Sequence, residues 1–175
     1  VQILPAPIKK YIEFQVLKFI YFSYEFNKYK TNKTNALEKM VFCVDKELKK
    51  KAQTGIYKAE ILNNSRDMVN EPPNIMTAAK FLADVKKKLS KKIKLEVFNE
   101  TRLKKEKMNL ILGVNSGSKN KPFLLTLSYL PLKKKDPAIL VGKGVTIDAG
   151  GINLKFGSFH DMKTDMTGAS VVFSV

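Results

Sequence analysis

Four charged side chains in the last fifth of the sequence have the types needed to bind divalent metal ions and an anionic reaction intermediate. They are two lysines and two aspartates of a glycine-rich stretch, namely Lys143, Asp148, Lys155 and Asp165. Glycine lets the backbone adopt positive φ values and lets a ligand approach closely. Carboxylates are hard oxygen donors for Zn²⁺, Mn²⁺ or Mg²⁺. These residue types therefore permit a metal site, although their spacing alone does not establish one.

Two other interpretations of this stretch stay open on its residues alone. Lysines are usually solvated and aspartate is common in turns, so a glycine-rich loop with a charged rim is the more ordinary interpretation. A phosphate-binding loop ranks low, because Lys143 is followed by Gly144 where that motif needs serine or threonine.

The elements that must position these residues follow from hydrophobic spacing. Apolar steps of three and four residues predict helices, and short alternating or β-branched runs predict strands. The expected helices cover 8–30, 46–70, a segment that starts after an N-cap at Thr77, and 100–107; the expected strands cover 40–44, 93–97, 109–114, 123–129 and 138–141. This order predicts an α/β fold with a mixed sheet flanked by helices. In such sheets sites form beyond the carboxyl ends of strands, where the stretch after Val141 would lie.

The composition excludes several classes of protein. The chain of 175 residues has a net charge of +16, but only Arg66 and Arg102 are arginines, so a nucleic-acid partner is not favoured. The single cysteine, Cys43, excludes an internal disulfide and cysteine-rich zinc sites. No apolar run reaches the roughly 18 residues of a membrane span, so we expect no membrane partner and a cytoplasmic location.

Two segments carry a resemblance to a known family. The run VGKGVTIDAGGINLK at 141–155, followed by MKTDMTGA at 162–169, resembles the signature of the leucyl aminopeptidase (cytosol aminopeptidase) family of two-metal metallopeptidases. The family pattern runs close to VGKG-[IV]-T-F-D-S-GG-[IL]-x-[IL]-K and then M-[KR]-x-DM-x-GA. The upstream run NSRDMVNEPPN at 64–74 resembles the start of the family's catalytic domain.

The resemblance implies a domain organisation. Residues 1–50 would be the end of an α/β N-terminal domain, residues 51–70 a connecting helix, and residues 71–175 the first part of a truncated catalytic domain. The two prolines of Asn70–Asn74 exclude a helix there and support a boundary at that point.

The resemblance also implies a role for each residue of the site. Asp148 matches the carboxylate that bridges two divalent ions, Zn²⁺ or Mn²⁺, and Asp165 the carboxylate of the more loosely bound ion. Lys143 matches a lysine that ligates the same ion as a neutral amine, and Lys155 the catalytic lysine. Met162 matches a residue beside the pocket for the first side chain of the substrate. We expect all five to contact a peptide, whose N-terminal residue, of leucine type, is removed by hydrolysis.

The sequence departs from the family in one important respect. A second motif, NTDAEGR, supplies further metal ligands and an arginine that positions a bicarbonate, and it is absent from these residues. We therefore expect an incomplete chain that is inactive alone and forms a homo-hexamer when complete. The alternative is a catalytically inactive interaction or structural protein with the peptidase fold, or a truncated gene product. His160 is expected on a surface loop, Cys43 in packing, and the aromatic residues of 11–26 in the core.

Overall fold

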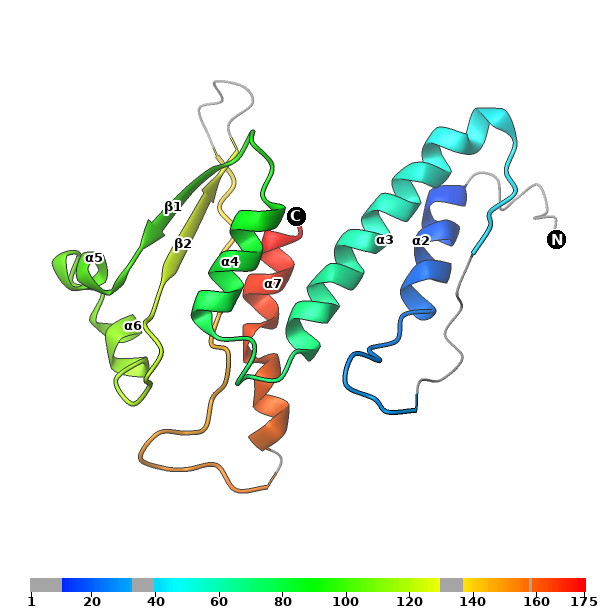
Figure 1. Cartoon of the computed structure of the whole chain (residues 1–175). Helices are drawn as coiled ribbons and strands as arrows, with labels where there is room; N and C mark the ends of the chain where they lie inside the picture. The colour runs from blue at the N-terminus through cyan, green and yellow to red at the C-terminus, as the bar shows by residue number, and fades with distance from the viewer. Residues whose placement is uncertain (1–10, 33–39, 130–136, 158) are drawn as a thin grey trace. The chain divides into compact units, whose positions relative to one another are not determined.

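The computed structural model describes residues 11–32, 40–129, 137–157 and 159–175. The chain forms two compact units that divide between Asp67 and Met68. The division falls inside the long helix α3 (Lys49–Asn70), which Figure 1 labels. None of the helices in the described ranges is long and apolar enough to cross a membrane.

The first unit is built on helix α2 (Ile12–Phe22), which packs against the N-terminal half of α3. A short 3-10 helix, η1 (Lys46–Leu48), leads into α3. The buried centre consists of Ile12, Val16 and Ala52. Helix α2 ends at Phe22, earlier than the expected residue 30, and residues 8–10 of that expected helix lie outside the described ranges.

Gly55 explains how closely the two helices of the first unit approach. An added Cβ at this position would collide with the main-chain oxygen of Glu13 and would lie 3.2 Å from the Cβ of Val16. Glycine weakens an isolated helix, yet here it is buried at the contact between α2 and α3. The expected long helix over 46–70 is therefore largely confirmed, and its glycine serves the packing.

Two expectations for the first unit were wrong. The aromatic residues of α2 are mostly exposed, because aliphatic Ile12 and Val16 take the buried positions while Phe14 and Phe22 face outward. Segment 40–44 is extended but not a strand, and Cys43 is exposed, since its neighbours Phe42 and Val44 pack against the core instead.

Arg66 ties the end of α2 to α3. Its guanidinium carbon lies 4.5 Å from the ring centroid of Tyr21 and 4.0 Å from that of Tyr24. Its Nη1 donates a hydrogen bond of 2.6 Å to the main-chain oxygen of Tyr21. Through these contacts Arg66 has a structural role within the first unit.

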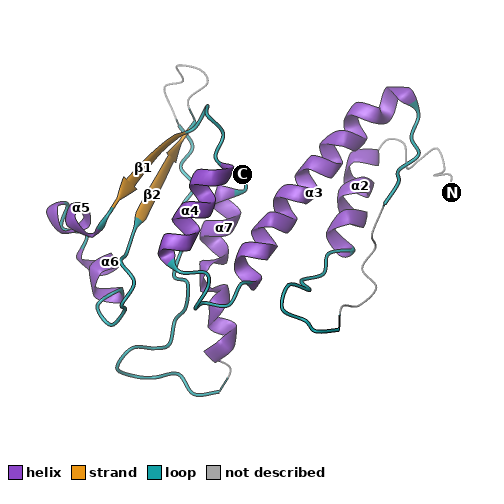
Figure 2. Ribbon diagram, viewed as in Figure 1, coloured by secondary structure: helices purple, strands orange, loops and turns teal. Residues whose placement is uncertain are grey.

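The second unit combines short helices with a two-stranded antiparallel sheet (Figure 2). Its elements in chain order are α4 (Ala78–Lys88), β1 (Lys94–Phe98), α5 (Glu100–Lys105), α6 (Asn109–Val114), β2 (Leu124–Ser128), the 3-10 helix η2 (Phe159–Met166) and α7 (Thr167–Phe173). The strands pair with Lys94 opposite Ser128 and Phe98 opposite Leu124. Thr77 caps α4 as expected, because its side chain accepts a hydrogen bond from the main-chain N–H of Lys80.

A cluster of methionines forms one core of the second unit. Met68, Met76 and Met166 are buried together, and Phe81 and Phe173 pack against them. The rings of these two phenylalanines lie 6.5 Å apart, edge to face, and join α4 to α7. The cluster therefore fixes η2 and α7, which carry part of the candidate site.

The α/β class is confirmed, but two of the strands expected in the second unit were wrong. Residues 109–114 form helix α6, because a short apolar run fits a helix as well as a strand. Residues 138–141 belong to no helix or strand, and Ile139 and Val141 are 81% and 89% exposed. The sheet in the described part of the chain therefore has two strands.

Candidate functional site

At the candidate site, the backbone at Gly142 crosses closely over the backbone at Gly168. Segment 142–144 lies against the start of α7 so closely that a Cβ on Gly142 would be 2.5 Å from the carbonyl carbon of Gly168. The N–H of Ala169 donates a hydrogen bond of 2.8 Å to the main-chain oxygen of Lys143. The contact fixes the backbone on both sides of the site.

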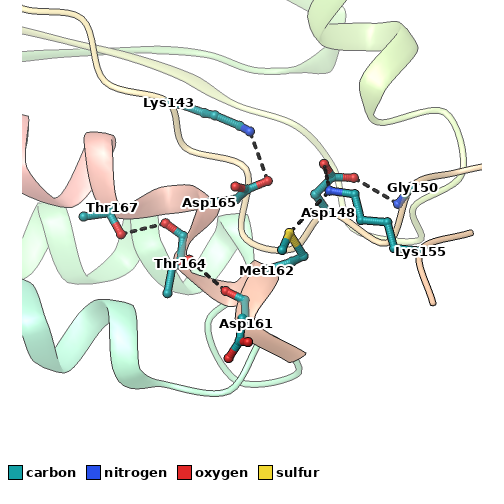
Figure 3. Close-up of polar contacts among 9 residues, drawn as sticks. All are labelled: Lys143, Asp148, Gly150, Lys155, Asp161, Met162, Thr164, Asp165 and Thr167. Atoms are coloured by element: carbon teal, nitrogen blue, oxygen red, sulfur yellow. Dashed lines mark hydrogen bonds and ion pairs between the residues drawn. The ribbon is translucent and has the colours of Figure 1, made fainter. Parts of the chain in front are cut away.

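Lys143 and Asp165 face each other beside this crossing. The Lys143 Nζ donates a hydrogen bond of 3.0 Å to Asp165 Oδ2, across 22 residues of sequence (Figure 3). Lys143 lies in the extended segment and Asp165 in η2. A lysine and a carboxylate that are distant in sequence are therefore brought into direct contact.

Asp148 and Lys155 form the second pair of the site. The Lys155 Nζ lies 2.7 Å from Asp148 Oδ2, and the N–H of Gly150 donates a hydrogen bond of 2.9 Å to Asp148 Oδ1. The hydrogen bond from Lys155, the one from Gly150 and the charges of both Lys155 and Lys143 lower the pKa of Asp148. Because the charge of Lys143 acts on Asp148, the two pairs belong to one site.

Met162 lies next to Lys155. Its Sδ accepts a hydrogen bond of 3.3 Å from the Lys155 Nζ, so this amine lies between a carboxylate and a thioether (Figure 3). Met162 is half-buried on η2. The structure thus brings all five predicted site residues to one place.

Lys163 and Met166 hold η2 in position, and sequence reasoning had assigned neither a role. The Lys163 Nζ donates a hydrogen bond of 3.3 Å to the main-chain oxygen of Asn70, the last residue of α3. A cation at the carboxyl end of a helix is favoured by the helix dipole. Met166 is buried in the methionine cluster. The family pattern M-[KR]-x-DM was the available signal for both positions.

The chemistry of the side chains fits part of a divalent metal site. Asp148 and Asp165 offer carboxylate oxygens, and Lys143 offers an amine once it is neutral. The described residues contain no group of three histidines, cysteines, aspartates or glutamates that could hold an ion. The side chains of Lys143, Asp148 and Asp165 are therefore of types that fit a metal site.

His160 is the only histidine of the sequence and lies near the start of η2. Its side chain is exposed and its Nε2 lies 3.4 Å from Asp161 Oδ1. Arg102 pairs with Glu96 at 2.7 Å and lies over the ring of Phe98, so it has a structural place in the second unit. His160 is at the surface as expected, but it lies in the 3-10 helix η2 and not in a loop.

A family model matches most of the chain. The model is described as the catalytic domain of the cytosol aminopeptidase family, and it matches residues 63–175. The matched range contains both ion pairs of the site.

Curated relatives agree with this match. The chain is 39% identical over 164 residues to a "Probable cytosol aminopeptidase" of Hamiltonella defensa, covering 87% of this chain and 32% of that protein. It is 37% identical over 174 residues to the "Cytosol aminopeptidase" of Haemophilus influenzae, covering 93% of this chain and 35% of that protein. The chain spans about a third of the length of these relatives.

Solved structures show the same fold. The bottromycin maturation enzyme BotP superposes with a TM-score of 0.77 at 26% identity, covering 96% of this chain and 35% of that one. A second BotP structure is a complex with Mn. A mutant of tomato leucine aminopeptidase superposes with a TM-score of 0.76 at 24% identity, covering 99% of this chain and 35% of that one.

Proposed function

The chain belongs to the cytosol aminopeptidase family, and from this premise we propose that it forms the first part of the catalytic domain of a metal-dependent enzyme that removes N-terminal residues, leucine above all, from peptides. One observation supports the proposal most. Both lysine–aspartate pairs of the family signature, Lys143–Asp165 and Asp148–Lys155, meet in one site inside the matched range.

Lys143, Asp148 and Asp165 are the proposed contributors to the metal site. The family uses divalent ions, and we propose two of them, Zn²⁺ or Mn²⁺, as the cofactors. When bound, such ions supply Lewis-acid polarisation of the scissile carbonyl and a nucleophilic water at neutral pH. Asp148 matches the bridging carboxylate of the family signature, and the hydrogen bonds from Lys155 and from the Gly150 N–H favour its ionised form by lowering its pKa.

Lys155 is the proposed catalytic residue. A cation positioned where negative charge develops on the substrate carbonyl stabilises the transition state more than the ground state. The Lys155 Nζ is held by Asp148 Oδ2 and Met162 Sδ, at 2.7 and 3.3 Å. An ammonium group has three N–H donors, so two contacts leave one donor for a substrate oxygen.

Met162 is the proposed contact for the first side chain of the peptide. Its thioether is unbranched, polarizable and adaptable, so it suits an aliphatic side chain such as leucine. Its contact with Lys155 would place that side chain beside the catalytic amine. All five site residues would then touch the substrate or the ions that hold it.

The remaining ligands are proposed to come from further polypeptide. By the resemblance, a second motif would supply an aspartate, a glutamate and an arginine that positions bicarbonate, and we propose that the complete protein forms a hexamer. The names of the curated relatives support a cytosolic location. A non-catalytic role for the fold is not favoured by these comparisons.

The test uses the longest natural polypeptide that contains these 175 residues, purified and supplied with Mn²⁺ or Zn²⁺. We expect hydrolysis of leucine 4-nitroanilide, loss of activity with a chelator, and no cleavage of the N-acetylated anilide, which lacks the free amine. The 175-residue chain assayed beside it is expected to be inactive. Absence of hydrolysis by the longer, folded, metal-supplied protein would refute the aminopeptidase proposal.

A further inference from the structure

Two stretches of backbone touch at the candidate site with no side chain between them. A Cβ on Gly142 would lie 2.5 Å from the carbonyl carbon of Gly168 and 2.7 Å from the main-chain nitrogen of Ala169. A Cβ on Gly168 would lie 2.9 Å from the main-chain nitrogen of Lys143. Each glycine thus faces backbone of the other segment, which cannot rotate aside as a side chain could.

This contact lies directly beside one ion pair of the site. Gly142 precedes Lys143, and Gly168 follows Asp165 by three residues. The hydrogen bond of 2.8 Å from the N–H of Ala169 to the main-chain oxygen of Lys143 holds the two segments in the same relative position. The separation of Lys143 Nζ from Asp165 Oδ2, 3.0 Å, therefore depends on how closely the two backbones approach.

We propose that Gly142 and Gly168 are positioning residues that set Lys143 against Asp165. The importance of that pair for catalysis rests on the proposed function, whereas the geometric claim does not. The second pair, Asp148–Lys155, lies within one loop closed by the hydrogen bond from Lys155 N to Ala149 O, at 3.0 Å. A larger side chain at Gly142 or Gly168 should therefore displace Lys143 and leave Lys155 in place.

Four glycine-to-alanine substitutions differ in how closely the added Cβ would approach its neighbours. Gly168→Ala and Gly142→Ala each place a methyl group against backbone, so the segments must separate. Gly144→Ala is milder, because its Cβ would meet only the Ala169 side chain, at 3.3 Å. Gly113→Ala is the matched control, with nothing within 4 Å of the added Cβ. None of these four glycines has positive φ, so the comparison isolates the steric effect.

The experiment measures the rate at which an amine-reactive reagent labels individual lysines of the metal-free full chain, followed by mass spectrometry. In Gly168→Ala we expect Lys143 to be labelled faster than in the wild type by roughly two- to fivefold, which corresponds to the loss of an exposed ion pair. Labelling of Lys155, and of Lys86 on α4 as a distant reference, should not change. Gly113→Ala should match the wild type at all three positions.

A double-variant cycle separates a positional effect from general loosening of the fold. Asp165→Asn alone removes the partner charge and should raise Lys143 labelling by a similar factor. Gly168→Ala combined with Asp165→Asn should give no further rise, because both act through the same ion pair. A further rise of equal size in the double variant, or unchanged Lys143 labelling in folded Gly168→Ala, would overturn the proposal.

Folding is checked by circular dichroism and thermal unfolding. If Gly168→Ala does not fold, Gly144→Ala decides the question: a smaller rise at Lys143 alone supports the proposal, and no rise overturns it. Because labelling needs neither metal nor peptide, its outcome is independent of the activity assay. Faster labelling without any peptide hydrolysis by the longer protein would retain the positioning role and refute the aminopeptidase proposal.

Discussion

The side-chain amine of Lys155 lies 2.7 Å from the carboxylate of Asp148, seven residues earlier in the chain. The loop between them is closed by the hydrogen bond from Lys155 N to Ala149 O, and the N–H of Gly150 holds the other carboxylate oxygen. Both carboxylate oxygens of Asp148 are therefore held in place before any ligand binds. Such preorganised charges cost little rearrangement when a reaction develops charge beside them.

Glu100 is predicted to titrate at unusually low pH. Hydrogen bonds from Lys104 and Lys121 lower its pKa from 4.5 to about 2. Because the pKa is depressed in the folded chain, the stabilisation is present above pH 4.5 and is lost as the pH falls toward 2. The ¹³C shift of the Glu100 carboxyl group, followed against pH by NMR, measures this directly.

A pair of lysine variants serves as the control for that titration. Lys121→Ala should raise the pKa of Glu100 toward its ordinary value, because the ion pair of 2.6 Å is lost. Lys119→Ala, two residues away, should leave the titration curve unchanged. An equal effect of both substitutions would show that general positive charge, and not the specific pair, sets the pKa.

Leu103 is predicted to be essential for the stability of the second unit. It is 0% exposed on α5, whereas Leu110 on α6 is 89% exposed. Leu103→Ala should lower the free energy of unfolding by about 2–5 kcal/mol, since it removes buried methyl groups and leaves a cavity. Leu110→Ala should change it by about 0.5 kcal/mol or less. Urea unfolding measures both, and similar values for the two variants would contradict the described core.

Gly55→Ala is predicted to destabilise the first unit although alanine favours helices. The substitution gains about 1 kcal/mol of helix propensity. The new methyl group, however, would collide with the main-chain oxygen of Glu13, and overpacking of this kind costs about 1–3 kcal/mol. Gly113→Ala in α6, which has free space, should be neutral or stabilising. A gain of stability in Gly55→Ala would show that α2 and α3 do not approach as described.

The sequence predicted the elements whose signals are local. Thr77 was recognised as an N-cap, and residues 93–97 as a strand, because capping residues and alternation act within a few positions. The sequence predicts a strand at 109–114, but its short run of apolar side chains fits a helix as well as a strand, and the segment forms α6. Segment 138–141 was expected to be buried, but burial depends on a partner surface that a local pattern does not contain.

The sequence predicted the residues of the candidate site but not which lysine would contact which aspartate. The family signature singled out Lys143, Asp148, Lys155 and Asp165, whose roles stay predictions. Which lysine meets which aspartate depends on the loop over 149–154 and on the crossing of Gly142 and Gly168. The crossing joins backbone segments more than twenty residues apart, whereas the loop closes over only a few residues, and spacing along the sequence specifies neither contact.

The proposed action of Lys155 on the substrate carbonyl can be measured through the activity of a Lys155→Ala variant. In the longest natural polypeptide containing this chain, we expect kcat for leucine 4-nitroanilide to fall by roughly 10²–10³-fold, with a much smaller change in KM, because the lost interaction stabilises the transition state. Lys86→Ala, on the exposed face of α4, should retain wild-type activity. Retention of wild-type kcat by folded Lys155→Ala would refute a catalytic role for Lys155.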